Sequence, residues 1–323
     1  MKSCWIKTEG GKAILEFRDV PPPQPKAGEI AVRVHATSMN RGELIVGGVV
    51  HGGAEKIGGT DAAGEVHAVG EGVTSFRPGD RVMGRARGGF AEYTVMDARQ
   101  AMPAPPCLSW EEAAAIPVAF LTAYEMLFQC GRLKHGEWLL ITGASSGVGV
   151  ASIQTAKAIG ASTIGTSGSA QKLAKLKAVG LDVGIETRAP DFADKVKAAT
   201  GGRGADLIVN CVGGSVFPEC VRSLAYQGRL ATVGYVDGVL KSEIDLGALH
   251  ANRYVLFGVS NAKLDPAQRA ETVRGFVRDV LPAVADGRIK PLIYKVFSFD
   301  DLRAAKDCIE SNAQAGKIVV RVA

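Results

Sequence analysis

Short apolar runs separated by turn residues dominate the first third of the chain. They occur at 29–36, 64–70, 80–84 and 91–96, with Gly- and Pro-rich stretches such as PPPQPKAGE and RPGD between them. Short strands punctuated by Gly and Pro are typical of a compact, barrel-like β domain. The segment SWEEAAAI at 109–116 then predicts a helix, with Ser109 as its N-cap and Glu112 completing a capping box.

From about residue 122 the pattern changes to an alternation of strands and helices. Strands are predicted at 138–142, 162–166, 182–186, 205–210, 228–233 and 254–259. Helices are predicted between most of them, at 150–159, 170–179, 192–200 and 218–225. Such alternation indicates parallel βαβ units and a doubly wound sheet. Six strands suit the two-halved Rossmann arrangement.

The last part of the chain predicts a return to the first domain. A long amphipathic helix is expected at 266–286, and Pro291 ends that pattern. A second helix follows, with Ser298 as N-cap and Asp301 completing its box, and GKIVVRV closes the chain as a strand. We expect an α/β protein with a discontinuous catalytic domain at 1–121 and 287–323. A Rossmann domain at 122–286 would be inserted in it, with a cleft between the two.

Composition and charge exclude several classes of protein. Hydrophobic residues make up 46% and charged residues 22% of the 323 residues, as in an ordinary globular enzyme. No apolar run reaches the roughly 18–20 residues of a membrane span, and the N-terminus has no apolar core of a signal peptide. The net charge of +5 is spread among acidic residues, so we expect no nucleic-acid partner. The six cysteines form no CxxC pair, which favours reduced thiols and a cytoplasmic location.

The stretch LLITGASSGVG at 139–149 is the first candidate binding motif. A predicted strand runs into small residues, and a helix follows. Ala144, Gly147, Val148 and Gly149 would let the backbone approach a pyrophosphate, and the helix N-terminus would add N–H groups and a positive dipole end. The pattern A-x-x-G-x-G departs from G-x-G-x-x-G, and the alternative is a tight turn without a ligand.

The end of the second predicted strand indicates which dinucleotide binds. NAD sites carry an Asp or Glu there for the ribose 2′-hydroxyl. This chain has Ser167, Gly168, Ser169 and Lys172 instead, and Arg188 follows the third strand. Hydroxyls, amides and cations attract a 2′-phosphate, which predicts NADPH as the cofactor. The alternatives are an exposed helix lysine and a surface arginine.

Other residues at the carboxyl ends of the predicted strands would complete the cofactor site. They are Val212 and Gly213 after the fourth strand, Gly234 and Tyr235 after the fifth, and Ser260 and Asn261 after the sixth. For Tyr235, simple packing is an equal alternative.

Four segments together resemble the zinc-independent quinone oxidoreductases of the zeta-crystallin type, within the medium-chain dehydrogenase/reductase superfamily. They lie at 59–82, 88–96 and 113–127 and in the AxxGVG turn. The resemblance extends over almost the whole chain, including the closing GKIVV. It implies a GroES-like catalytic domain beside the Rossmann domain, and a homodimer.

The resemblance also assigns roles to single residues. Asn40 and Thr122 match family residues beside the nicotinamide, and Lys317 matches the terminal Gly-Lys that faces the cofactor. Glu43 and Ile45 stand where the family has Asp and Tyr. The alternatives are a turn residue for Asn40, a helix N-cap for Thr122 and a surface acid for Glu43.

The 2′-phosphate loop of the family is matched by GSAQK at 168–172. The family's Tyr after the third strand is replaced by Thr187, with Arg188 retained beside it.

Zinc-dependent relatives need a catalytic Cys, a Gly-His-Glu motif and a lobe of clustered cysteines. Here Asn40 stands near the first position, Gly59-Thr60-Asp61 replaces the second motif, and the cysteine lobe is missing. These segments cannot assemble three tetrahedral N/S ligands, so we expect no metal.

Without a Lewis acid, reduction of a conjugated acceptor is easier than oxidation of an alcohol. We expect NADPH-dependent hydride transfer to a quinone, with Asn40, Thr122 and Glu43 as the catalytic candidates. The first alternative is reduction of the double bond of an enone or enoyl thioester. The second is a non-catalytic protein that binds RNA or serves as a crystallin.

Overall fold

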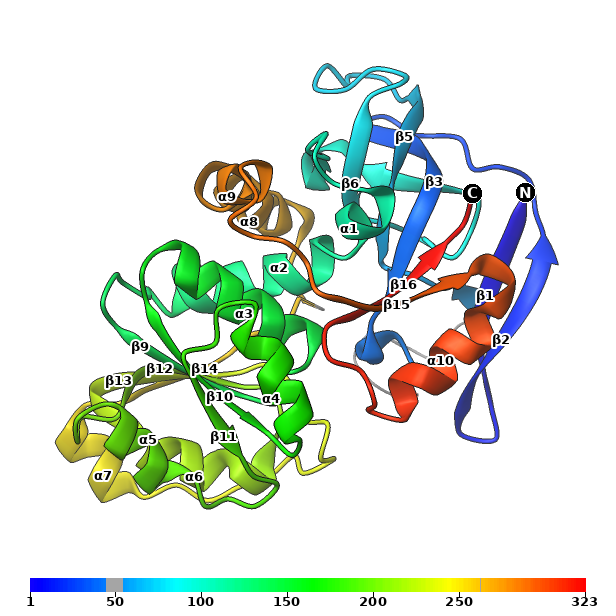
Figure 1. The fold of residues 1–323 in the computed structure, drawn as a ribbon. Coiled ribbons are helices and arrows are strands. Elements are labelled where there is room, and N and C mark those ends of the chain that lie inside the picture. Colours follow the sequence, from blue (N-terminus) through cyan, green and yellow to red (C-terminus); the bar gives the residue numbers. More distant parts are fainter. Residues whose placement is uncertain (45–54, 262) are drawn as a thin grey trace. The chain divides into compact units, whose positions relative to one another are not determined.

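The computed structural model describes residues 1–44, 55–261 and 263–323, and the chain divides into two compact units. The first contains Met1–Leu121 and Ala262–Ala323, and the second contains Thr122–Asn261 (Figure 1). Ile45 lies outside the described residues. No helix in the described ranges is long and apolar enough to cross a membrane.

Two antiparallel-rich sheets build the first unit. Its strands are β1 (Lys2–Glu9), β2 (Lys12–Asp19), β3 (Glu29–Met39), β4 (Lys56–Ile57), β5 (Asp61–Val69), β6 (Arg81–Arg85), β7 (Tyr93–Asp97), β8 (Ala101–Pro103), β15 (Ile293–Ser298) and β16 (Lys317–Arg321). One sheet has the order β2-β1-β4, and the other β15-β16-β3-β5-β6-β8 with β7 also paired to β3. Strand β3 is the centre, and its Ile30, Val32 and Val34 are fully buried in one apolar cluster. The predicted strands at 29–36, 64–70, 80–84 and 91–96 and the closing strand are confirmed.

The helices of the first unit are α1 (Trp110–Ala114), α8 (Pro266–Asp279), α9 (Leu281–Ala285) and α10 (Leu302–Glu310). The predicted capping box of α1 is present, with Ser109 accepting from the Glu112 backbone and the Glu112 side chain accepting from the Ser109 backbone. The single helix predicted at 266–286 is wrong: it is divided into α8 and α9, and Pro282 stands in the first turn of α9. Proline lacks the N–H that a continuous helix would need there.

The start of α10 also differs from the prediction. Ser298 precedes a 3₁₀ turn at Phe299–Asp301, and its hydroxyl donates to the Asp301 carboxylate at 2.7 Å. The side chain therefore makes no cap bond to the helix backbone, and α10 begins only at Leu302.

Helices α8 and α9 belong to the first unit, whereas the sequence predicts a Rossmann domain that extends to residue 286. Buried Val273 and Phe276 give α8 an apolar face, and the helix contacts β8 and the 3₁₀ turn at Ala98–Gln100. Burial of that face against the β-rich unit explains why the division falls at 261/262.

Six parallel strands form the sheet of the second unit. They are β9 (Trp138–Thr142), β10 (Ser162–Ser167), β11 (Val183–Glu186), β12 (Ala205–Asn210), β13 (Leu224–Thr232) and β14 (Val255–Gly258), in the order β11-β10-β9-β12-β13-β14. This is the two-halved doubly wound order, so the predicted fold class is confirmed. The order reverses between β9 and β12, where such sheets bind ligands.

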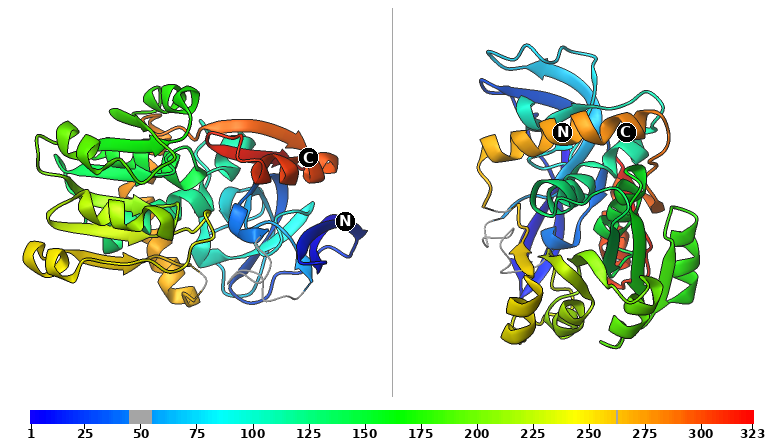
Figure 2. Two further views of the ribbon diagram at one scale, coloured as in Figure 1. Left: turned by 90° about the horizontal axis from the view of Figure 1, so that it is seen from below. Right: turned by 90° about the vertical axis from the view of Figure 1, so that its left-hand side faces the viewer.

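Helices cover both faces of this sheet (Figures 1 and 2). They are α3 (Gly147–Ala158), α4 (Ala170–Lys177), α5 (Ala193–Ala199), α6 (Phe217–Arg222) and α7 (Leu246–Asn252), while α2 (Pro117–Tyr124) crosses the boundary between the units and continues as a π-helix at Glu125–Cys130. Because both faces are covered, the central strands read as continuous apolar runs. Leu139, Leu140 and Ile141 of β9 are accordingly fully buried.

Candidate active site

A buried carboxylate, Asp61, organises a polar cluster in the first unit. Its Oδ2 accepts hydrogen bonds from Ser38 Oγ at 2.5 Å, Asn40 Nδ2 at 2.9 Å and Lys317 Nζ at 3.2 Å. Its Oδ1 accepts from the backbone N–H of Val118 at 2.8 Å. Asp61 is fully buried and Lys317 is 5% exposed, so this ion pair is shielded from water. A buried charge persists only when it is paired and hydrogen-bonded in this way.

Asn40 joins this ion pair to a second carboxylate. Its Oδ1 accepts from Lys317 Nζ at 2.7 Å, which orients the amide. Its Nδ2 is then shared among Asp61, Glu43 at 2.7 Å and Thr60 Oγ1 at 3.2 Å. Asn40 makes no side-chain cap bond at the 3₁₀ turn that follows it, so its amide is committed to the cluster and not to the turn.

Glu43 is buried and its carboxylate is asymmetric. Oε1 accepts from Asn40 and from both the N–H and the hydroxyl of Thr60, whereas Oε2 is buried with no hydrogen-bond partner in the described residues. Burial raises the pKa of Glu43, and the hydrogen bonds from Thr60 and Asn40 oppose that shift. A carboxyl with a raised pKa can hold a proton and give it up, as a general acid must. The alternative of a surface loop acid does not fit a side chain that is 3% exposed.

The register of the sheet brings these residues together. Strand β16 is antiparallel to β3 with Ile318 opposite Met39, which places Lys317, at the start of β16, beside Asn40. Strand β5 begins at Asp61 on the other side of β3. Three strand ends therefore meet at one edge: Ser38 and Asn40 come from the end of β3, and β5 and β16 contribute one polar side chain each.

In the second unit, the turn between β9 and α3 is built from tightly packed small residues. Ser146 caps α3 by accepting from Gly149 N–H at 3.0 Å. A Cβ on Gly149 would lie 2.5 Å from the Ala144 carbonyl oxygen. Ala144 is fully buried and its N–H donates to Thr166 O at 3.0 Å, so this residue fixes the turn against β10. Gly147 and Val148 form the first turn of the helix, where backbone N–H groups can meet a phosphate.

The loops after β12 and β13 lie beside this turn. Asn210 is fully buried, and its Oδ1 accepts from Thr142 Oγ1 at 3.0 Å and from the N–H groups of Val212 and Gly213. Gly213 has φ +134°, and a Cβ there would collide with Asp237.

A Cβ on Gly234 would lie 2.9 Å from the Cys211 carbonyl oxygen, which shows that the loop after β13 lies close to the loop after β12. The neighbouring Tyr235 is 40% exposed. Its ring is therefore available to a ligand and is not a packing residue of the core.

Lys172 and Arg188 lie together at the end of β10. Ser169 caps α4 by accepting from the Lys172 N–H at 3.3 Å. A Cβ on Gly168 would lie 2.5 Å from Arg188 Cγ, so the arginine passes directly over the glycine. Burial and the Arg188 charge both lower the pKa of Lys172. Two cations beside Ser167 form a basic site that suits a phosphate.

Thr122 and Asn261 are joined, with Asn261 Nδ2 donating to Thr122 Oγ1 at 3.3 Å. Thr122 lies inside α2 and is 6% exposed, so the alternative of a helix N-cap is wrong. Ser260 precedes Asn261 at the carboxyl end of β14.

Sequence reasoning misses several members of both sites. It treats Asp61 and Thr60 only as replacements for a zinc motif, and it does not single out Thr142 and Asn210. All four residues lie at or beside the end of a strand. A search for polar residues at the ends of the predicted strands could therefore have identified them from the sequence. Among the described residues, no group of three or more His, Cys, Asp or Glu side chains could hold a metal ion.

Comparisons with known proteins identify the family. The profile described as "Alcohol dehydrogenase GroES-like domain" matches residues 26–106, and the one described as "Zinc-binding dehydrogenase" matches residues 147–277. The chain belongs to the medium-chain dehydrogenase/reductase superfamily, and the expected GroES-like and Rossmann pairing is confirmed.

Two curated relatives differ greatly in length from one another. A component of the phenolphthiocerol/phthiocerol polyketide synthase of Mycobacterium tuberculosis is 33% identical over 98% of this chain, but the chain spans only 14% of that protein. A quinone oxidoreductase of Rattus norvegicus is 28% identical, over 99% of this chain and 97% of that protein.

Solved structures agree over the full length. A mycobacterial protein complexed with NADPH superimposes with a TM-score of 0.87 at 25% identity, covering 100% of both chains. An enoyl reductase superimposes with a TM-score of 0.83 at 25% identity, covering 98% of both chains.

Proposed function

We propose that this chain is an NADPH-dependent oxidoreductase that transfers hydride to a quinone without a metal. The observation that carries the proposal is the buried set of Asn40, Lys317, Asp61 and Glu43, which combines cationic and amide donors with a carboxyl of raised pKa. The similarity to a quinone oxidoreductase along nearly the whole length of both proteins supports it.

The second unit would hold the cofactor. At Gly149 and Gly213 protein atoms already fill the space that a Cβ would need, so these loops pack tightly, and the backbone N–H groups at the start of α3 would meet the pyrophosphate. Ser167, Lys172 and Arg188 would bind the 2′-phosphate, and the NADPH complex of a structural relative supports that choice. Gly234, Tyr235, Ser260 and Asn261 would complete the site. When bound, the reduced nicotinamide supplies the hydride.

The first unit would stabilise charge on the acceptor. The Lys317 ammonium has three N–H groups, of which two are directed to Asn40 and Asp61. The third can donate to an acceptor oxygen that gains negative charge during reduction. Asp61 holds the ammonium in place, and Glu43 can supply a proton from its unpaired Oε2 side. The amide, hydroxyl and ammonium would act as donors and the two carboxylates as acceptors that hold these donors in place.

The second candidate is reduction of an α,β-unsaturated carbonyl compound. Glu43 favours it, because reduction of a carbon–carbon double bond requires a proton at carbon, whereas quinone oxygens take protons readily from water. The similarity to an enoyl reductase supports this candidate.

One assay separates these candidates. NADPH consumption is measured with 1,4-benzoquinone and with an α,β-unsaturated ketone or thioester. We expect the quinone to be reduced. Reduction of the alkene alone would reject the quinone assignment, and consumption of NADPH with neither acceptor would reject both.

We also propose a homodimer formed through the edge of the second unit. Strand β14 ends the six-stranded sheet, and Val255 on it is 52% exposed, with Leu246 of α7 also exposed. An apolar edge strand is a template for pairing with a second copy. Sedimentation of the protein tests this, with Val255→Lys expected to give monomers.

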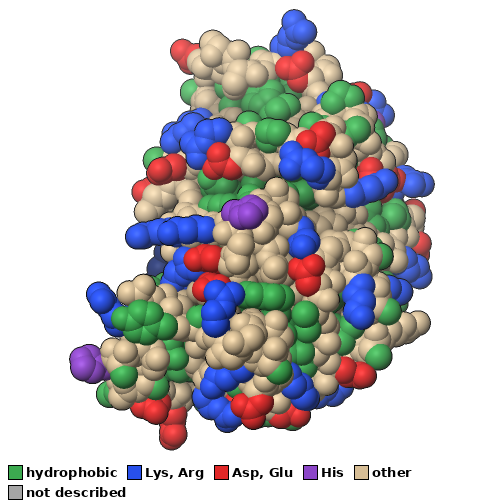
Figure 3. All heavy atoms as spheres, turned by 60° about the vertical axis from the view of Figure 1, so that its left-hand side comes forward, with side chains coloured by type: hydrophobic (Ala, Val, Ile, Leu, Met, Phe, Trp, Pro, Cys, Tyr) green, Lys and Arg blue, Asp and Glu red, His purple; other side chains and the backbone are tan. Residues whose placement is uncertain are grey.

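RNA binding is the candidate from a different class. On the face shown in Figure 3, Lys and Arg side chains alternate with Asp and Glu and do not gather into a tract. Titration with RNA at physiological salt tests this candidate, and sub-micromolar binding that NADPH displaces would favour it.

A further inference from the structure

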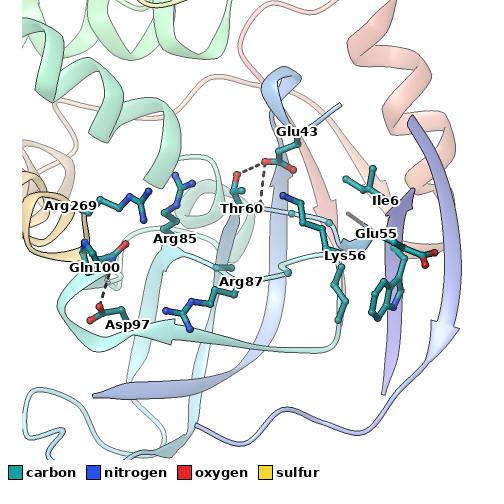
Figure 4. A pocket seen from close by; sticks show the side chains of 17 residues that line it. Ile6, Glu43, Glu55, Lys56, Thr60, Arg85, Arg87, Asp97, Gln100 and Arg269 are labelled. Atoms are coloured by element: carbon teal, nitrogen blue, oxygen red, sulfur yellow. Dashed lines mark hydrogen bonds between the residues drawn. The ribbon is translucent and has the colours of Figure 1, made fainter. Parts of the chain in front are cut away.

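The first unit contains a cavity of about 570 Å³ whose charges the proposed reaction does not explain. It is lined by residues of β1 and β4, the segment at 58–60 that precedes β5, the end of β6, the 3₁₀ turn at Ala98–Gln100 and the first turn of α8 (Figure 4). Glu43 and Thr60 of the polar cluster also line it. Its volume is that of a small-molecule site.

The acidic groups in the lining are Glu43, Glu55 and Asp97, and each has a partner. Asp97 accepts from Arg99 at 2.7 Å, and Glu55 is bonded to Arg18. The Oε1 atom of Glu43 is committed to Asn40 and Thr60. The acidic side chains of the lining are therefore bonded to groups other than Arg85.

Arg85 lies beside a second guanidinium, that of Arg269. Their side chains lie side by side at one end of the cavity (Figure 4). The Arg85 guanidinium makes no hydrogen bond or ion pair with any residue in the described ranges. Burial is the main cause that lowers the pKa of Arg85, and repulsion by the neighbouring Arg269 charge lowers it further, while the charges of Asp61 and Glu43 oppose the shift. An anion between them would remove this repulsion.

We propose that Arg85 and Arg269 bind a carboxylate group on the acceptor substrate. Planar guanidinium groups match the two oxygens of a carboxylate, and a pair of them can hold it from two sides. The backbone N–H groups at the start of α8 are not needed for this, because Asp265 and Gln268 already form a capping box there. With the carboxylate at this end, the reducible part of the acceptor extends toward Glu43 and Thr60. This inference rests on the proposed oxidoreductase function and names the substrate class.

Matched acceptors test the proposal. The NADPH-loaded protein is assayed with 3-penten-2-one and its carboxylated counterpart 4-oxo-2-pentenoate, and with 1,4-naphthoquinone and its 2-carboxylate. We expect Arg85→Gln and Arg269→Gln to raise KM for the carboxylated member of each pair about tenfold, since a charge-assisted contact is lost. KM for the neutral member should change by less than about twofold, and Arg85→Lys should recover part of the loss.

Two control variants isolate the effect from net charge. Arg87→Gln removes a guanidinium that lines the same cavity but is paired with Glu29, and Arg274→Gln removes an exposed one from α8. Both control variants should leave the ratio of KM values for the neutral and the carboxylated acceptor of each pair unchanged. Equal losses for neutral and carboxylated acceptors in Arg85→Gln, or the same shift in the controls, would overturn the proposal.

Calorimetry separates failure of this proposal from failure of the proposed function. Benzene-1,4-dicarboxylate cannot be reduced, so its binding does not depend on turnover. Binding that both Arg→Gln variants abolish supports the site even if no acceptor is reduced, and no heat with the wild-type protein overturns it. Tighter binding of phenyl phosphate than of the dicarboxylate would reject a carboxylate in favour of a phosphate.

Discussion

The two units build their polar sites in opposite ways. In the first unit, side chains from the ends of β3 and β16 converge on Asp61 at the start of β5, and these contacts join residues distant in the chain. In the second, short contiguous loops of small residues expose backbone N–H groups, and side chains such as Ser146 and Asn210 shape those loops. The first site stabilises buried charges by pairing them, and the second packs its loops closely by omitting side chains.

This difference has a physical consequence for mutation. A site built on paired charges is sensitive to loss of a partner, because the remaining charge stays buried. A site built on missing side chains is sensitive to added atoms, because backbone cannot move aside as a side chain can. The predictions below test these two sensitivities, from the largest expected effect to the smallest.

Removal of Asp61 should be the most damaging change in the first unit. Asp61→Ala leaves the Lys317 ammonium, 5% exposed, without its carboxylate, which should cost about 3–5 kcal/mol of unfolding free energy. Chemical denaturation measures this cost. The double variant Asp61→Ala, Lys317→Met should recover much of the loss, and a double variant no more stable than Asp61→Ala would show that the ion pair is not the cause.

An added methyl group should be the most damaging small change in the second unit. Gly149→Ala places a Cβ 2.5 Å from the Ala144 carbonyl oxygen and should cost about 1–3 kcal/mol. We also expect NADPH binding, measured by calorimetry, to be lost. Gly258→Ala is the matched control, because no atom lies within 4 Å of its Cβ position. Equal stability of the two variants would contradict the tight turn.

The same contrast explains how much can be predicted from the sequence. The predicted strands at 138–142 and 205–210 have the bounds that the structure shows, and the sequence also predicts the β9–α3 turn, because both features depend on contiguous residues.

The hydrogen bond between Asn40 and Lys317 depends on the pairing of β3 with β16, and no local pattern encodes that register. Arg85 and Arg269 are missed for the same reason, since only the folded chain brings β6 next to α8. The helix predicted at 266–286 is too long because its amphipathic spacing continues past the end of α8. In the structure α8 ends at Asp279, and Pro282 lies in the first turn of the separate helix α9.

Lys172 provides a test of cofactor choice that leaves the fold intact. Lys172→Ala should weaken NADPH binding about tenfold, or about 1.4 kcal/mol, and leave NADH binding unchanged, because only the former carries the 2′-phosphate. Calorimetry with both dinucleotides measures the ratio. Lys177→Ala, an exposed position on the same helix, controls for net charge. An equal loss for both dinucleotides would place Lys172 away from the 2′-phosphate.

Glu43 links the charge chemistry of the first unit to pH. Its pKa is raised in the folded protein, so the protonated carboxyl is the form that the fold favours. Its favourable contribution is complete below the unfolded pKa of about 4.3 and disappears as pH rises through the higher folded value. Glu43→Gln, which cannot ionise, should therefore gain on the order of 1 kcal/mol relative to wild type between low and neutral pH. Denaturation series across this range measure the gain, with exposed Glu9→Gln as the control.

If Glu43 also donates the proton, wild-type turnover of an unsaturated ketone should fall as pH rises through the pKa of Glu43 in the folded protein. The Glu43→Gln variant should lack that fall in turnover. Parallel stability curves for the wild type and Glu43→Gln would mean that the Glu43 carboxylate is as well accommodated in the fold as in water, and the proton-donor role would lose its physical basis.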